Sequence, residues 1–197
     1  TQGVSSAASD VYKRQQLQER VARFAGALAD QGVTKGDRVL LYMPMIAESV
    51  IAMLACARLG AVHSVVFGGF APKELASRID DSAPVVIVTA SGGVEPKRRI
   101  EYLPAIEEAL QLSDHAPSAV LVHERDGFVT TVAEARERAG DGPAWLSWAE
   151  AQDGVTPADP VTVKATDPLY ILYTSGTTGT PKGCLLYTSD AADDTPC

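Results

Sequence analysis

The sequence predicts an α/β fold in which strands and helices alternate around a mostly parallel sheet. Short apolar runs and stretches with helical spacing follow one another along most of the chain, separated by roughly 10–15 residues. The apolar runs are continuous, which is typical of strands that are buried on both faces. Glycine or proline ends several of these segments, as expected where helices and strands stop.

The N-terminal half predicts three helices that alternate with three strands. Apolar residues recur with helical spacing over Gln16–Asp30, and Gly32 follows as the stop. A turn at Lys35-Gly36-Asp37 then leads into an apolar run that Pro44 ends. The segments in order are a helix over Gln16–Asp30, a strand over Val39–Tyr42, a helix over Ala47–Gly60, a strand over Ala61–Phe67, a helix over Ala71–Ser82 and a strand over Pro84–Ala90.

The C-terminal half repeats this alternation less regularly. The stretch over residues 125–167 is more polar and is richer in Gly, Pro and Ala, so it carries the weakest pattern. The segments in order are a helix over Tyr102–Leu112, a strand over Ser118–His123, two short helices within Thr130–Gly140 and Leu146–Gln152, and a strand over Leu169–Tyr173.

Composition argues against several classes of protein. The net charge of -8 makes nucleic acid an unexpected partner, because a basic face is needed for contacts with phosphates. No apolar run approaches the roughly 18 residues that span a membrane, and no secretory leader is visible, so we expect a cytoplasmic protein, or one of an organelle matrix in a eukaryote. Cys56, Cys184 and Cys197 form neither a disulfide framework nor a metal-binding pattern. The sequence does not indicate an oligomeric state.

The two ends of the chain share a relationship at the level of DNA. Ser5–Gln15 (SSAASDVYKRQ) can be back-translated into a DNA word whose reverse complement, read one base in, encodes CLLYTSDAAD, which is Cys184–Asp193. The word resembles a transposase adaptor used for sequencing libraries. We therefore expect residues 1–15 and 184–197 to be translated adaptor and residues 16–183 to be the protein itself. The alternative is a polar N-terminal arm and an acidic tail.

A loop rich in threonine, serine and glycine follows the last predicted strand. Thr174–Gly183 reads TSGTTGTPKG. Its glycines allow the backbone to turn amides toward one point, its hydroxyls can donate hydrogen bonds, and Lys182 adds a positive charge. These groups suit the oxygens of a polyphosphate, whereas the alternative is an ordinary polar turn. A Walker A loop fits poorly, because Pro181 precedes the lysine and Gly183 replaces the Ser or Thr that binds Mg²⁺.

Three other features allow both a structural and a functional interpretation. Phe67-Gly68-Gly69 follows a strand, where glycines either form a turn or let a ligand approach the backbone. Lys97-Arg98-Arg99 is a basic cluster in an acidic chain, and such a run is usually solvated. For His63, within a strand, we expect a core histidine with satisfied hydrogen bonds; Asp80 and Asp81 have the pattern of solvated charges at a helix end.

The loop YTSGTTGTPKG resembles the phosphate-binding motif of the AMP-forming acyl-CoA synthetases, the adenylate-forming family. The block from YMPMIAESV to SRIDDSAP is similar to the acetyl-CoA and propionyl-CoA synthetase branch. Within that branch, GVEPKRRIEYLPAIEEAL and LYILYTSGTTG look more like the propionyl-type members, and acetate is the alternative substrate. The resemblance covers nearly all of residues 16–183.

This resemblance implies part of the N-terminal AMP-binding domain, without the C-terminal domain. It also implies a ligase reaction in which ATP, with Mg²⁺, and a short carboxylate give an acyl-adenylate and diphosphate, after which coenzyme A displaces AMP. The small-molecule substrates are thus ATP, coenzyme A and propionate or acetate. A non-catalytic nucleotide-binding module is the alternative for the chain as it stands.

The resemblance assigns roles to two sets of residues and to no catalytic one. Lys182 does not match the family's catalytic lysine, which belongs to the C-terminal domain, and no metal-binding residue is expected. Glu95 stands where acetyl-type members often carry an arginine, so the chain departs from the family pattern at this position of the coenzyme A set. The ATP phosphate-binding set is Thr174, Ser175, Gly176, Thr177, Thr178, Gly179 and Lys182; the coenzyme A set is Phe67, Gly68, Gly69, Glu95 and Arg98.

Overall fold

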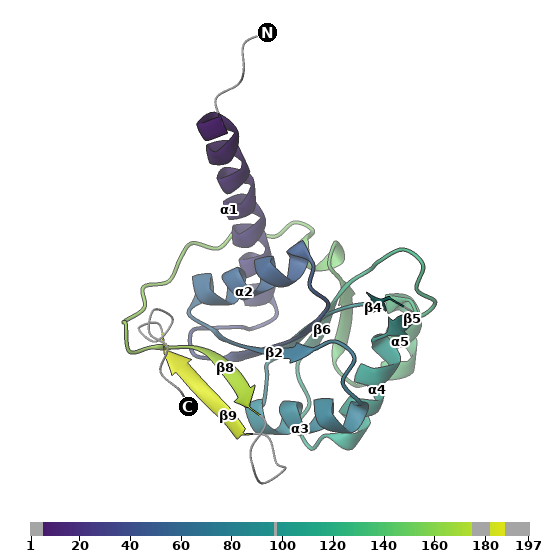
Figure 1. Ribbon diagram of the computed structural model, residues 1–197. Coiled ribbons are helices and arrows are strands. Elements are labelled where there is room, and N and C mark those ends of the chain that lie inside the picture. The colour runs from purple at the N-terminus through teal and green to yellow at the C-terminus, as the bar shows by residue number, and fades with distance from the viewer. Residues whose placement is uncertain (1–5, 97, 175–181, 188–197) are drawn as a thin grey trace.

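A seven-stranded sheet forms the centre of the part of the chain that the computed structural model describes, residues 6–96, 98–174 and 182–187 (Figure 1). Its strands in spatial order are β7 (Ala144–Ser147), β6 (Ala119–His123), β3 (Val86–Ala90), β1 (Arg38–Met43), β2 (Val62–Phe67), β8 (Pro168–Thr174) and β9 (Lys182–Tyr187). Neighbours from β7 to β8 pair in parallel, and β9 pairs antiparallel to β8 at the edge. The predicted α/β class with a mostly parallel sheet is confirmed.

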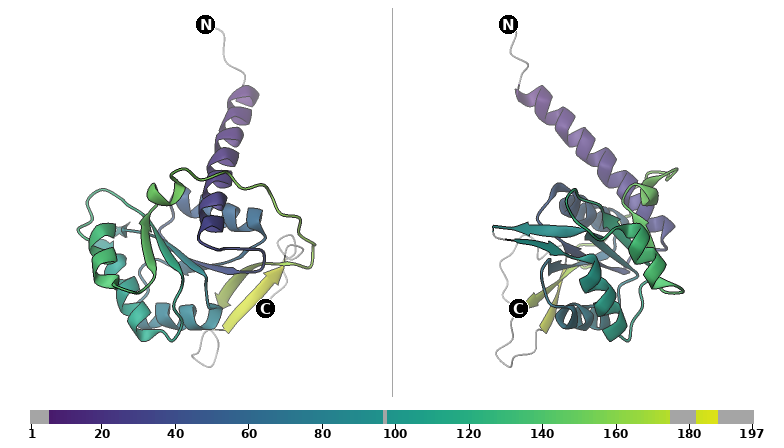
Figure 2. Two further views of the ribbon diagram at one scale, coloured as in Figure 1. Left: turned by 180° about the vertical axis from the view of Figure 1, so that it is seen from behind. Right: turned by 90° about the vertical axis from the view of Figure 1, so that its right-hand side faces the viewer.

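Helices cover both faces of this sheet (Figure 2). On one face α1 (Ser6–Asp30) and α2 (Ala47–Leu59) pack on a core that includes Phe24 and Leu41. On the other face α3 (Pro72–Ser82), α4 (Leu103–Leu112) and α5 (Val132–Ala139) pack on a core that includes Leu40 and Tyr42. Successive residues of β1 therefore enter opposite cores, which explains why its apolar run is continuous.

The predicted strands and helices up to β6 are found with end shifts of one or two residues, apart from the start of α1. One prediction in the C-terminal half is wrong. Leu146–Gln152 was expected to be helical, but Leu146 and Ser147 belong to β7, and only Glu150–Gln152 forms a 3₁₀ turn, η1. The buried Trp145 pairs with Val120 of β6, so tertiary pairing decides the conformation here.

A two-stranded hairpin that was not predicted projects beside the sheet. It consists of β4 (Gly92–Glu95) and β5 (Arg98–Glu101), which pair antiparallel. Tyr102 follows β5 and is almost fully buried, and a Cβ atom on either Gly68 or Gly93 would overlap its hydroxyl. The hairpin is thereby packed tightly against the turn that follows β2.

The first half of α1 projects away from the domain (Figures 1 and 2). Residues 13–20 are all exposed, and burial begins at Val21. Both α1 and β9 run across the boundaries expected from the DNA relationship, at residues 15/16 and 183/184. In the part of the chain that the structure describes, no helix has the length and apolar character needed to cross a membrane.

Candidate functional site

The strands β2 and β8 are parallel neighbours and end at the same edge of the sheet. His63 pairs with Tyr170 and Ser64 with Ile171, and this register, continued, brings Phe67 level with Thr174. The carboxyl edge of a parallel sheet is where ligands bind in open α/β folds. The first residues of the two predicted binding segments, Phe67 and Thr174, therefore lie side by side, although they are far apart in the sequence.

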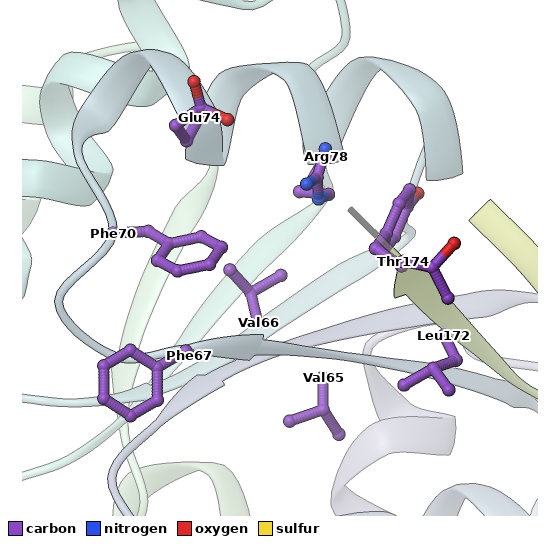
Figure 3. Close-up of a pocket in the computed structure, with 9 residues that line it drawn as sticks. Val65, Val66, Phe67, Phe70, Glu74, Arg78, Leu172 and Thr174 are labelled. Carbon is purple, nitrogen blue, oxygen red and sulfur yellow. The ribbon is translucent and has the colours of Figure 1, made fainter. Parts of the chain in front are cut away.

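A cavity of about 560 Å³ opens between these strand ends and α3 (Figure 3). Phe70 and Val66 face each other on the α3 side of β2, while Val65 and Leu172 point to the opposite side. The residues that line the cavity are Val65, Val66, Phe67, Phe70, Glu74, Arg78, Leu172, Tyr173 and Thr174. Most of this lining is apolar, with Arg78 and Glu74 as its charged groups.

The two ends of the predicted phosphate loop are adjacent. Thr174 ends β8, Lys182 begins β9, and the two residues are paired across the strands. Both side chains are exposed. The remaining members of the predicted set (Ser175, Gly176, Thr177, Thr178 and Gly179) lie outside the described residues.

The predicted coenzyme A set gathers around the turn after β2. A Cβ atom placed on Gly69 would lie 3.7 Å from Phe67 Cε1 and 3.8 Å from Glu95 Oε1. At the tip of the hairpin, Arg98 Nε donates a hydrogen bond to Glu95 Oε2 at 2.9 Å. Strands β2, β4 and β5 thus bring this set together, with the Arg98 side chain largely exposed and paired to a carboxylate.

The local structure itself requires glycine at both positions of the turn after β2. Gly68 is buried against Tyr102, so its missing side chain makes room for the tyrosine ring. Gly69 has a φ of +123°, which only glycine adopts readily, and its amide donates a hydrogen bond to the Tyr42 hydroxyl at 3.1 Å. Of the two, Gly69 is the exposed residue.

Sequence reasoning missed a group of side chains from α3 that contacts the end of β8. The Arg78 guanidinium lies over the Tyr173 ring, with Cζ 4.1 Å from the ring centroid. The Tyr173 hydroxyl donates a hydrogen bond to Asp81 Oδ2 at 2.5 Å. Asp81 was expected to be a solvated charge, and this contact corrects that expectation. No sequence motif links the three residues, because α3 and β8 come together only in the fold.

Asp80 is also more than a solvated charge. Its Oδ1 accepts hydrogen bonds from the Ser113 hydroxyl at 2.5 Å and from the amide of Asp114 at 2.9 Å. The Ser113 hydrogen bond is the main cause that lowers the pKa of Asp80. Asp80 therefore fastens the chain after α4 to the end of α3.

His63 is buried, as expected, but its hydrogen bonds are not all satisfied. Its ring stacks on Tyr170 with centroids 5.5 Å apart, and its Nδ1 atom has no hydrogen-bond partner among the described residues. Burial lowers the pKa of His63 to about 4, so the ring is neutral at physiological pH. The expectation of a satisfied core histidine is wrong on this point.

Within the described ranges, no group of three or more His, Cys, Asp or Glu side chains could hold a metal ion. The edge instead offers apolar surface, threonine and lysine at the loop ends, and a buried arginine close to them. Hydroxyl and ammonium groups suit a phosphate-bearing ligand, and the apolar surface suits a less polar part of the same ligand or a second one.

Comparison with known proteins gives consistent results. Residues 10–194 match the family of AMP-binding enzymes. The chain is 53% identical over 174 residues to an uncharacterised protein of Pseudomonas aeruginosa, and 49% identical over 168 residues to the human mitochondrial acyl-CoA synthetase short-chain family member 3. It is 48% identical over 170 residues to an acetyl-coenzyme A synthetase of Parvibaculum lavamentivorans. These alignments cover 88%, 85% and 86% of this chain.

A solved structure has the same fold. The acetoacetyl-CoA synthetase from Streptomyces lividans superposes with a TM-score of 0.74 at 28% identity, over 88% of this chain and 25% of that one. The aligned segments make up 26%, 23% and 25% of the lengths of the Pseudomonas, human and Parvibaculum proteins. The chain thus spans about a quarter of the length of the proteins it matches.

Proposed function

The chain belongs to the AMP-binding enzyme family, and from that premise we propose that it is part of a short-chain acyl-CoA synthetase. In the proposed reaction a carboxylate oxygen attacks the α-phosphorus of ATP and diphosphate leaves. The thiol of coenzyme A then attacks the acyl carbon, and AMP leaves. The names of the human and Parvibaculum relatives support this class of reaction.

One structural observation carries the proposal, namely the convergence of the two binding segments. The chain leaves β8 at Thr174 beside the end of β2, where Phe67 and Gly69 begin the second segment. A nucleotide held by the loop and a coenzyme A held at the turn would therefore approach one edge of the sheet. That arrangement suits a reaction in which the two ligands act in sequence on one acyl group.

The residues take the following proposed roles. Hydroxyls and amides from Thr174 to Gly179 bind the ATP phosphates, with Lys182 as a nearby cation. We propose that Mg²⁺ enters with ATP, whose charge it offsets. Phe67 and Gly69 contact the coenzyme A nucleotide and Arg98 faces its phosphates, which requires the Arg98–Glu95 pair to open or to be bridged by the ligand.

We propose propionate as the preferred carboxylate and acetate as the alternative. The support is the similarity of residues 93–110 and 169–179 to propionyl-type members of the branch. We propose a location in the cytoplasm or in an organelle matrix; the human relative is named as mitochondrial, which supports the second.

We propose further that residues 16–183 form part of the N-terminal AMP-binding domain and that residues 1–15 and 184–197 are adaptor-derived. The reverse-complement relation between Ser5–Gln15 and Cys184–Asp193 supports this division. On this proposal the ligase activity belongs to the full reading frame, and the 197-residue chain alone forms no acyl-CoA.

The test uses the full reading frame recovered from the source locus. Carboxylate-dependent exchange of diphosphate into ATP reports the first step, and acyl-CoA formation reports the second. We expect exchange with propionate above that with acetate. We expect Thr174→Val to lower the exchange rate by roughly tenfold or more, because one donor to the phosphates is lost. Thr162→Val, at an exposed position, is the matched control.

Two results would overturn the proposal. The first is a full-length protein that shows no exchange with any short carboxylate while it still binds ATP. The second is acyl-CoA formation by the 197-residue chain, which would contradict the assignment of activity to the longer protein.

A further inference from the structure

Tyr173 is held from two directions by α3, one residue before the phosphate loop begins. Its ring lies under the Arg78 guanidinium, 4.1 Å from centroid to Cζ, and its hydroxyl donates to Asp81 Oδ2 at 2.5 Å. In Figure 3, Arg78 projects from α3 toward the end of β8, where Thr174 lies. The direction in which the chain leaves β8 is therefore tied to the helix.

Both contacts have the character of specific interactions. The Arg78 residue is 5% exposed, and its Nε atom has no hydrogen-bond partner among the described residues, so the tyrosine ring is the group that faces the buried cation. Burial and the hydrogen bond to Asp81 both raise the pKa of Tyr173, which keeps its hydroxyl protonated as a donor. An aromatic face stabilises a desolvated guanidinium more strongly than it stabilises a solvent-exposed guanidinium.

The far end of the loop meets the same group. Gly183 is paired with Tyr173 across β8 and β9. A Cβ atom placed on Gly183 would lie 3.0 Å from Tyr173 Cε1 and 3.2 Å from Asp81 Oδ2. The C-terminal end of α3 therefore contacts the residues on both sides of the loop.

We propose that Arg78 and Asp81 are positioning residues for the phosphate loop. They act through Tyr173, which they hold so that Thr174, the first residue of the loop, faces the nucleotide. This inference rests on the proposed function, because it assigns a purpose to the fixed geometry at the base of that loop. None of the three side chains needs to touch ATP.

The first test measures KM values in variants of the full-length enzyme. Tyr173→Phe removes the hydroxyl and keeps the ring, while Asp81→Ala removes the acceptor. We expect each to raise the KM for ATP in the exchange reaction by about tenfold, as for loss of a hydrogen bond to a charged group, with little change in the KM for coenzyme A. Asp81→Asn, which retains an acceptor oxygen, should restore most of the affinity.

A double-mutant comparison distinguishes a positioning role of the Tyr173–Asp81 contact from a general loss of structure. The double variant Tyr173→Phe/Asp81→Ala should be no worse than either single variant, because all three lose the same contact. Tyr170→Phe is the matched control, since it removes a hydroxyl from the same strand that makes no hydrogen bond to the described residues. Additive effects in the double variant, or an equal rise in both KM values, would overturn the inference.

A second readout does not depend on activity. Trypsin can cut the 197-residue chain after Lys182, whose side chain is exposed. We expect Tyr173→Phe and Asp81→Ala to be cut there several times faster than the wild type and Tyr170→Phe. Equal cleavage rates would overturn the inference, whereas faster cleavage together with a full-length protein that lacks exchange would remove the proposed function and leave the anchoring intact.

Discussion

His63 shows what a single buried titratable residue does to this fold. Its folded-state pKa, about 4, lies below the ordinary value of 6.5 because burial disfavours the charged ring. Between these two values the unfolded chain binds more protons than the folded chain. The contribution of His63 to stability is therefore fully present above about pH 6.5 and decreases as the pH falls toward 4.

We expect this residue alone to lower the free energy of unfolding by roughly 2 kcal/mol at pH 5 relative to pH 7. His123, whose pKa burial also lowers, acts in the same direction. Urea unfolding of the wild type, His63→Phe and the matched control His115→Phe at both pH values measures the effect. His63→Phe should show a smaller fall than the other two, and an unchanged fall would contradict the role assigned to His63.

At the residue scale, the sequence was informative where the candidate residues form one local motif. Thr174 and Lys182 were identified from the run of Thr, Ser, Gly and Lys itself, and the fold places them as a pair. Arg78, Asp81 and Tyr173 could not be grouped in this way. A helix residue and a strand residue about ninety positions apart give no local pattern, and their contact depends on how β8 is added to the sheet.

At the scale of elements, the hairpin β4–β5 and the turn after β2 depend on one another through Tyr102. A Cβ atom on Gly68 would overlap the Tyr102 hydroxyl and would lie 2.5 Å from its Cζ atom. Because the ring is also enclosed by Gly93 and lies at a tilt of 50° against Tyr42, with centroids 4.8 Å apart, it has little space into which it could move.

We expect Gly68→Ala to destabilise the chain by about 1–3 kcal/mol, as overpacking of a full core does. In a Tyr102→Leu background the same substitution should cost clearly less, because the ring that it overlaps is gone. Chemical unfolding of the two single variants and the double variant measures the coupling. If the losses in the free energy of unfolding are strictly additive, the Tyr102 ring is not the reason that position 68 requires glycine.

Strands were predictable from the sequence where both of their faces are buried. Prediction failed where a strand forms only by pairing with a segment distant in the sequence. β1 and β3 read as continuous apolar runs because both of their faces are buried. β7 spans only the four residues Ala144–Ser147, and its pairing with β6 makes it a strand. The β4–β5 hairpin lacks an apolar run altogether, so nothing in its sequence indicated a strand.

At the scale of the whole molecule, α1 enters the core of the domain from Val21 onward. Residues 13–20 are exposed, whereas Phe24 is completely buried and stacks on Trp148 with centroids 3.7 Å apart. The boundary proposed for the adaptor-derived segment, at residues 15/16, lies within this exposed stretch. We therefore expect the stability of the domain to be separable from residues 1–15.

We expect deletion of residues 1–15 to change the free energy of unfolding by less than about 0.5 kcal/mol, as for surface changes. Phe24→Ala, by contrast, should cost about 3–5 kcal/mol. The urea concentrations at the midpoint of unfolding measure the stability of the two variants. Sequencing of the source locus shows whether other codons precede Gln16. A large loss on deletion, or a locus that encodes Ser5–Gln15, would contradict the proposed division.

The position of β8 in the sheet has a consequence for how the chain folds. β8 pairs with β2, yet everything from α3 to η1 lies between them in the sequence. During synthesis β1, β2 and β3 can associate long before β8 has left the ribosome, and closing so long a loop is entropically slow. The edge at which we propose that the nucleotide binds is accordingly expected to assemble last, and until then the flank of β2 remains open to unwanted strand pairing.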